Sequence, residues 1–233
     1  MGKRIIQQRR GRGGSTYRVR QKASIEAKPG YLKDLNGEYQ VLKLISSPGH
    51  SVPLAKLINK EGDKFYNFAT NLLYVGQTIK IGGNKPGDIA CLGDLKNGTS
   101  IFNLEHRPKD GGKFIRTGGN SGTIMNKNGN IVTILFPSKK EKKLDVSCRA
   151  TIGVAAGDGK LSKPIMKAGK QYFIMKSKSK LWPRTSAVAM NAIDHPFGSG
   201  RGKRVKSKIV KRNASPGKKV GHLSPRRTGR KKR

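Results

Sequence analysis

One segment near the carboxyl-terminal end of the chain carries side chains that could donate hydrogen bonds or transfer protons. Within residues 190–201, an amide, a carboxylate and an imidazole occur at Asn191, Asp194 and His195, and glycines follow them. Glycine lets a backbone approach a ligand closely, so the neighbouring polar groups could contact it. Asp194 and His195 are sequence neighbours whose side chains usually diverge, so they need not form a catalytic pair. On chemistry alone, a binding site and a structural turn fit the segment equally well.

Other signatures of catalysis, nucleotide binding and metal binding lack the spacing that their chemistry requires. The glycine-rich run at 153–160 places Lys160 one position too far for a phosphate loop, and Leu161 follows it. The four histidines form no His-x-x-x-His pair, and Cys91 and Cys148 belong to no Cys-x-x-Cys pair. We therefore expect no catalytic residue, no metal site and no cofactor, and we expect both cysteines to be reduced.

Positive charge dominates the composition. The 233 residues include 50 Lys and Arg against 13 Asp and Glu, a formal net charge of +37. Residues 1–30 carry +8, residues 201–233 carry +15, and the long middle segment carries +14. Such self-repulsion opposes a compact state unless an anionic partner is present. Nucleic acid and an anionic membrane surface are the candidate partners.

The two terminal segments favour nucleic acid over membrane. Glycines and a proline interrupt residues 9–20 and 201–219, which destroys the apolar stripe of a membrane-surface helix. No run approaches the roughly 18 apolar residues of a membrane span, and the basic amino terminus lacks the apolar stretch of a secretory signal. We expect a cytosolic protein whose tails are disordered alone and become ordered on phosphates.

Between the tails, short β-strands alternate with turns, which predicts a mainly β fold. The first block has the strand number and length of a small barrel, and the oligonucleotide-binding type is the usual solution for a basic chain. Its strands are predicted at 39–45, 52–58, 64–69 and 77–81.

A second strand-rich block, expected to form another compact barrel, follows a glycine-rich connector at 109–122. A hairpin turn is predicted at 126–130. Its strands are predicted at 124–125, 131–136, 147–152 and 171–176. Helix is expected to be minor, one or two turns near Leu54 or Leu161.

Several motifs occur along nearly the whole chain in a fixed order. They lie at 2–11 (GKRIIQQRRG), 99–105 (TSIFNLE), 148–153 (CRATIG), 188–191 (VAMN), 194–196 (DHP) and 216–222 (PGKKVGH). With these motifs the chain resembles the universal large-subunit ribosomal protein L-two family, and its archaeal and eukaryotic branch in particular. Two positions depart from the family pattern. Ser186-Ala187 stands where Arg-Gly is common, and Ser199 replaces the middle glycine of a triple.

The resemblance implies an order of four segments. They are a basic RNA-binding extension at 1–30, an oligonucleotide-binding-type barrel at 31–88, an SH3-like barrel at 89–185 and an RNA-penetrating basic extension at 186–233.

It also implies a function: a structural constituent of the large ribosomal subunit that binds ribosomal RNA. Such a protein organises RNA near the peptidyl-transferase centre and supports subunit association, tRNA binding and peptide-bond formation. The implied partners are large-subunit ribosomal RNA, other ribosomal proteins and, through a bridge, the small subunit. No membrane contact and no homo-oligomer are expected. The residues expected to contact RNA are Arg4, Arg9, Arg10, Arg12, Arg18, Arg149, Asn191, Asp194, His195, Arg201, Lys203, Arg204, Lys218, Lys219, His222, Arg226 and Arg227.

Two alternatives remain open from the sequence. A general nucleic-acid-compacting protein, similar to chromatin proteins, would bind any duplex with comparable affinity. Alternatively, His195 could act as a general acid or base in peptidyl transfer, which would make the protein part of the catalyst.

Overall fold

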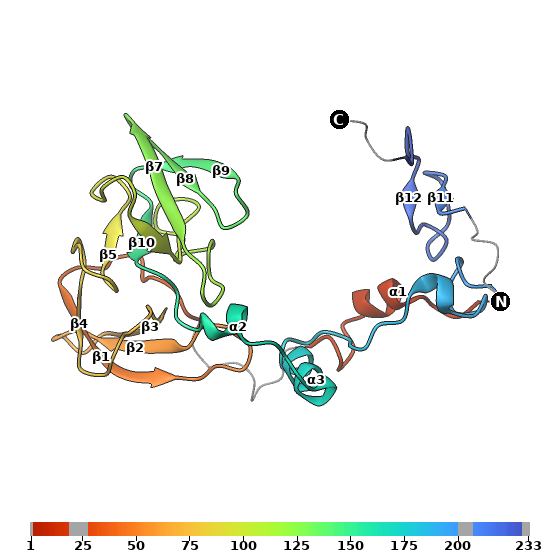
Figure 1. The fold of residues 1–233 in the computed structure, drawn as a ribbon, viewed down its shortest axis with the longest axis horizontal. Coiled ribbons are helices and arrows are strands. Elements are labelled where there is room, and N and C mark those ends of the chain that lie inside the picture. The colour runs from red at the N-terminus through yellow and green to blue at the C-terminus, as the bar shows by residue number, and fades with distance from the viewer. Residues whose placement is uncertain (1, 19–27, 200–206, 230–233) are drawn as a thin grey trace. The chain divides into compact units, whose positions relative to one another are not determined.

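The computed structural model describes residues 2–18, 28–199 and 207–229, and it separates into two units (Figure 1). The terminal unit comprises Met1–Val19 and Tyr172–Arg233, and the central unit comprises Arg20–Gln171. The boundaries between the two units therefore lie at 19–20 and 171–172. The four segment boundaries expected from the family resemblance stay predictions.

The first sheet of the central unit has four strands. The strand order is β3-β2-β1-β4, with every neighbouring pair antiparallel. The strands are β1 (Glu38–Ile45), β2 (Leu54–Ile58), β3 (Lys64–Phe68) and β4 (Thr78–Lys80). In β1, Tyr39 and Val41 are buried while Gln40 is exposed, and the Tyr39 ring meets the edge of Phe65 at 5.1 Å between centroids. The predicted strands of the first block are confirmed.

The helical turn expected near Leu54 was wrong. Leu54 begins β2, pairs with Ile45 and Phe68 on its two sides, and is completely buried. Leucine is a good helix former, but propensity is a weak local preference that tertiary pairing overrides. A single turn of helix, α2 (Gly159–Ser162), does form at Leu161, as predicted.

The second sheet of the central unit has six antiparallel strands in the order β5-β10-β6-β7-β8-β9. Its strands are β5 (Ile89–Cys91), β6 (Ser100–Phe102), β7 (Gly122–Asn128), β8 (Ile131–Leu135), β9 (Glu141–Asp145) and β10 (Arg149–Ile152). The predicted hairpin is present, because Asn128 pairs with Ile131 and Gly129 takes a φ of 56°. The glycine-rich connector at 109–122 lies between β6 and β7, so it interrupts the sheet rather than preceding it.

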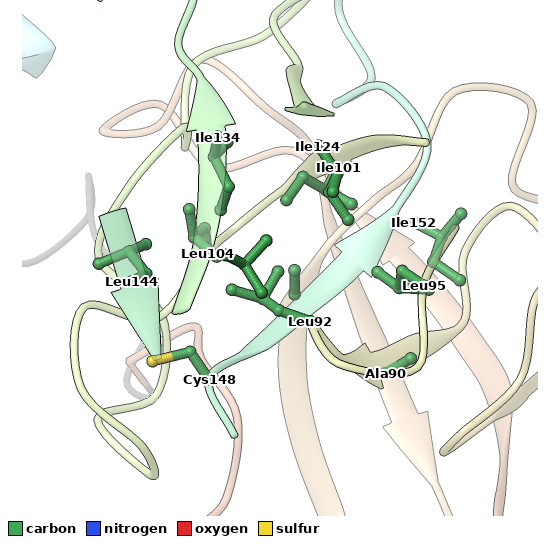
Figure 2. Packing of buried hydrophobic residues seen from close by; sticks show 12 residues of the cluster. Ala90, Leu92, Leu95, Ile101, Leu104, Ile124, Ile134, Leu144, Cys148 and Ile152 are labelled. Carbon is green, nitrogen blue, oxygen red and sulfur yellow. The ribbon is translucent and has the colours of Figure 1, made fainter. Parts of the chain in front are cut away.

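A core of twelve buried residues holds the second sheet together, and Figure 2 shows its side chains converging between the strands. Leu92, Ile101, Leu104 and Ile134 are completely buried in it. Each such side chain contributes roughly 1.5–3 kcal/mol of transfer free energy. Cys148 belongs to the same core as a free thiol, and its burial raises the pKa of that thiol to about 11.

The strand predicted at 171–176 was also wrong, because these residues lie in the helix α3 (Ala168–Ser177). The run Tyr172-Phe173-Ile174 has high β-propensity, but that propensity reflects packing on a half-buried pleated surface. No residue of α3 is buried, so no such surface exists for the run to join. α3 is the longest helix of the described residues, and none of their helices is long and apolar enough to cross a bilayer.

The terminal unit contains little regular structure. Its elements are α1 (Ile6–Gly11), most of α3, the single 3-10 turn η2 (Ala187–Ala189), β11 (Ile209–Val210) and β12 (His222–Leu223). At the start of α1, Gln8 accepts the backbone N–H of Ile5 at 3.1 Å, which satisfies one free donor there. β11 and β12 form a parallel pair.

Candidate nucleic-acid interface

The terminal unit brings the two ends of the chain into direct contact. The backbone N–H of Lys3 donates to the carbonyl oxygen of Ile193 at 2.9 Å, and Lys3 Nζ lies 3.6 Å from Asp194 Oδ1. Gly217 packs against the Gln8 side chain, where an added Cβ would lie 3.2 Å from Nε2. Residues from both basic extensions therefore build one surface.

A tight turn places the segment that the sequence singled out. The backbone N–H groups of Asp194 and His195 both donate to the carbonyl oxygen of Asn191, at 3.0 and 3.2 Å, and Gly198 N–H donates to His195 O at 2.9 Å. A Cβ at Gly198 would collide with the Asn191 backbone. Glycine is therefore required at 198 to close the turn, and Asn191 acts through its backbone as the centre of that turn.

The imidazole of His195 is held in one protonation form. The ring is buried, and the backbone N–H of Phe197 donates to Nδ1 at 3.0 Å. Because Nδ1 accepts this bond, the neutral ring carries its proton on Nε2. Burial also lowers the pKa of His195, which favours the neutral ring. His195 can therefore offer an Nε2–H donor to a ligand.

His195 lines a cavity of about 430 Å³, called the His195 cavity below. Three cations line it, namely Lys3, Arg4 and Lys218, and no Asp or Glu is among its lining residues. Ile5, Pro196 and Pro216 supply apolar contact. The chemistry of this lining suits an anion or a hydrogen-bond acceptor on an RNA strand.

The remaining predicted residues of the terminal unit are distributed over its surface. Exposed side chains are those of Arg9, Arg10, Arg12, Arg18, Lys219, His222, Arg226 and Arg227. Arg18 is partly engaged, because its Nε donates to the carbonyl oxygen of Gly13 at 2.7 Å. Arg201, Lys203 and Arg204 lie outside the described residues. Of the predicted residues, the structure thus brings Arg4, His195 and Lys218 together around the His195 cavity, whereas the Asp194 carboxylate pairs with Lys3.

Arg149 has an internal role that the sequence did not predict. It lies in the central unit, is 8% exposed, and pairs with the completely buried Glu105 at 2.8 Å between Nη2 and Oε1. Its Nε donates to Glu105 Oε2, and its Nη1 donates to the carbonyl oxygens of Leu32 and Lys33. These bonds fix Arg149 within the protein rather than presenting it to an external phosphate.

Sequence reasoning missed a basic cavity of the central unit, of about 510 Å³, called the Arg116 cavity below. The Arg116 guanidinium lies 4.6 Å from the centroid of the Phe68 ring and donates to the Pro29 carbonyl oxygen, while its buried Nε has no partner among the described residues. His50 also lines the cavity. Desolvation, and then the charge of Arg116, lower the pKa of His50.

The other cations of the Arg116 cavity are Lys28, Lys64 and Lys113, and Asp110 is the one carboxylate among its lining residues. Tyr66 adds a partly buried aromatic ring. The run Lys64-Phe65-Tyr66, a lysine followed by two aromatic residues, was the available sequence signal. It was masked because the same run is typical of a β-strand and was assigned to one.

Comparison with known proteins agrees with the motifs. A family model described as Ribosomal Proteins L2, C-terminal domain, matches residues 85–216. The "Large ribosomal subunit protein uL2" of Hyperthermus butylicus is 44% identical, covering 100% of both chains. The proteins of the same name from Archaeoglobus fulgidus and Methanocaldococcus jannaschii are each 42% identical, covering 98% and 100% of this chain and 99% and 100% of their own. The resemblance seen in the sequence is confirmed, and the chain belongs to the L2 family of large ribosomal subunit proteins.

Proposed function

We propose that this chain is a structural, non-enzymatic constituent of the large ribosomal subunit that binds ribosomal RNA with both of its units. The observation that carries the proposal is the uncompensated positive charge of the described surface. Among the described residues, four cations form an ion pair with a carboxylate, namely Lys3, Lys80, Lys109 and Arg149. The other basic side chains need an external anion, and family membership supports ribosomal RNA as its source.

The His195 and Arg116 cavities can select an RNA by its shape as well as attract it by charge. In the His195 cavity, Arg4 and Lys218 provide uncompensated charge, Lys3 is paired with Asp194, and His195 provides a directional donor. In the Arg116 cavity, a guanidinium and an aromatic ring lie together, which suits an unpaired base beside a phosphate. A general nucleic-acid-compacting protein would not need such shaped sites, so this arrangement favours a folded RNA partner.

The protonation form of His195 favours an architectural role over proton transfer. A general base must present an unprotonated nitrogen to the reacting amine. Nδ1 is already occupied by the Phe197 N–H, and Nε2 carries the ring proton. We therefore expect His195 to hold RNA near the peptidyl-transferase centre by hydrogen bonding, while RNA performs the chemistry.

The wider set of partners follows from the family assignment. We expect contacts with other ribosomal proteins, support of tRNA binding, and subunit association through a bridge to the small subunit. We also expect a cytoplasmic location on the large subunit and no homo-oligomerisation. Co-migration of the tagged chain with large subunits through a high-salt wash would support this placement. Release of the chain in that wash would contradict it.

A binding titration tests the proposed function directly. The full chain is titrated with large-subunit ribosomal RNA and with duplex DNA of equal length at several salt concentrations. If about ten phosphates are neutralised, the logarithm of the binding constant falls with a log–log slope near minus seven to minus nine, and the folded RNA is preferred. A flat salt dependence would refute phosphate binding, and equal affinity for both polymers would support the compaction alternative.

A further inference from the structure

The terminal unit contains a second cavity, called the Tyr17 cavity, that shares no lining residue with the His195 cavity. Its volume is about 520 Å³. Both chain ends line it, with Ile6, Arg10 and Tyr17 from the amino-terminal segment and residues 178–181 and Arg184 from the carboxyl-terminal one. Of its residues, only Arg10 was expected to contact RNA.

Hydrogen bonds within the terminal unit give this cavity a defined wall. Ser179 Oγ donates to the carbonyl oxygen of Arg18 at 2.8 Å, which joins the two chain segments beside the cavity. Arg18 Nε donates to Gly13 O at 2.7 Å, and Tyr17 N–H donates to Gly14 O at 2.9 Å, so the segment that carries Tyr17 is folded back on itself. The position of Tyr17 is therefore set by the protein.

The lining combines cations with apolar surface. Its four cations are Arg10, Lys178, Lys180 and Arg184, and no Asp or Glu is among the lining residues. None of the four is in an ion pair with a described carboxylate. Tyr17 and Ile6 are half-buried, and Leu181 adds further apolar surface.

This lining fits a ligand that is anionic at one end and flat and apolar at the other. A simple phosphate would pair with the cations but would make no stacking contact with the ring of Tyr17. An RNA nucleotide has both parts, because its base can stack on an aromatic ring and its phosphates pair with Lys and Arg. The cavity also falls within the size range of small-ligand sites, roughly 300–1,000 Å³.

We propose that the Tyr17 cavity binds one unpaired nucleotide of ribosomal RNA, with its base against Tyr17 and its flanking phosphates held by Arg10, Arg184 and the two lysines. The proposal rests on the RNA-binding function and adds a specific site to it. Since the two chain ends build the cavity jointly, occupation by RNA also stabilises the contact between them.

Photo-crosslinking tests the site in the full chain. The chain is bound to large-subunit ribosomal RNA in which a photoreactive analogue of the native base replaces each unpaired nucleotide, one position at a time, and crosslinked peptides are identified by mass spectrometry. We expect one unpaired nucleotide to crosslink to Tyr17. Tyr17→Phe should retain the crosslink at that position, whereas Tyr17→Leu should lose it. Absence of any crosslink at 17 over all unpaired positions, while the RNA stays bound, would overturn the site.

A charge variant with a matched control separates local from general effects. Arg184→Gln should lower the crosslink yield at Tyr17 at least tenfold, whereas Arg212→Gln, which removes the same charge from another exposed position of the terminal unit, should leave the yield unchanged. Equal losses in the two variants would overturn the proposal, because the cavity would then act only as part of the general charge.

Two further measurements separate failure of the proposed site from failure of RNA binding, and an RNA strand from a free nucleotide as the ligand. Total RNA retention on a filter measures RNA binding by the chain. Retention without a Tyr17 crosslink would contradict only the Tyr17 site. Loss of retention in the unmodified chain would contradict both the site and the RNA-binding function. Uridine monophosphate at the same concentration as the RNA should not compete, because it carries only one of the two phosphates that flank a nucleotide within a strand. Effective competition by the free mononucleotide would overturn the assignment to an RNA strand.

Discussion

Arg149 and Glu105 form a two-pronged ion pair inside the central unit, with 2.8 Å between Nη2 and Oε1 and 3.2 Å between Nε and Oε2. The Glu105 carboxylate also accepts the backbone N–H groups of Lys109, Gly111 and Arg149. One buried carboxylate thus ties β10 to the start of the glycine-rich connector. Removing either charge leaves the other without compensation in the interior.

We expect Glu105→Gln to lower the free energy of unfolding of the central unit by about 3–5 kcal/mol. Urea denaturation followed by circular dichroism measures the change. Glu38→Gln is the matched control, because Glu38 pairs with Lys80 at an exposed position and its loss should leave the unfolding free energy nearly unchanged. Equal stability of Glu105→Gln and the unmodified chain would show that the buried pair is dispensable.

The terminal unit is expected to lose stability in mild acid through His195. Burial lowers the pKa of His195 in the folded state below its ordinary value of 6.5. The unfolded chain therefore takes up a proton first as the pH falls below about 6.5, and the free energy of unfolding decreases with it. The fluorescence of Trp182, the single tryptophan, follows unfolding between pH 7.5 and 5.5. His195→Gln should flatten this dependence, and an unchanged slope would contradict the assignment.

The turn around His195 should not tolerate a side chain at 198. Gly198→Ala places a Cβ against the Asn191 backbone, and we expect a loss of about 1–3 kcal/mol in the unfolding free energy of the terminal unit. Gly169→Ala is the control, because Gly169 lies in α3 with no atom within 4 Å of its added Cβ. That change should not destabilise the protein, because alanine has a higher helix propensity than glycine. Urea titration of both variants, followed by Trp182 fluorescence and circular dichroism, tests the difference.

Cys148 should resist thiol reagents in the folded chain. Its thiol is completely buried and its pKa is raised to about 11, so the reactive thiolate is scarce at neutral pH. In a Cys91→Ser background, we expect slow labelling by a disulfide reagent at pH 8 and rapid labelling in urea. Rapid labelling without denaturant would mean that the core of the second sheet opens readily.

In assembled ribosomes, His195→Gln also distinguishes a structural role of His195 from a role in proton transfer. Glutamine keeps an amide donor but cannot transfer a proton at neutral pH, so we expect near-normal rates of the chemical step together with normal assembly. A pre-steady-state measurement of peptide-bond formation provides the comparison. A loss of about a hundredfold in ribosomes that assemble normally would indicate direct proton transfer.

Much of the central unit could be predicted because its signals are local. The alternation at Tyr39 and Val41 and the turn at Gly129 each depend on a few neighbouring residues, and both appear as expected. Residues 171–176 were mistaken for a strand because a strand also needs a partner, which a local pattern cannot report. The Arg116 cavity was missed for a related reason, since its lining comes from distant segments.

The sequence by itself determined that the partner is anionic, because net charge is additive and needs no coordinates, and its ordered motifs determined the family. Only the tertiary structure decided how individual cations are used. Arg149 is held inside by Glu105, 44 positions away, whereas Arg10 faces a cavity that residues beyond 177 complete. It also decided which nitrogen of His195 carries the proton, because the Phe197 N–H reaches Nδ1 only within the folded turn. Side-chain roles of this kind depend on distance and burial, which the order of residues does not contain.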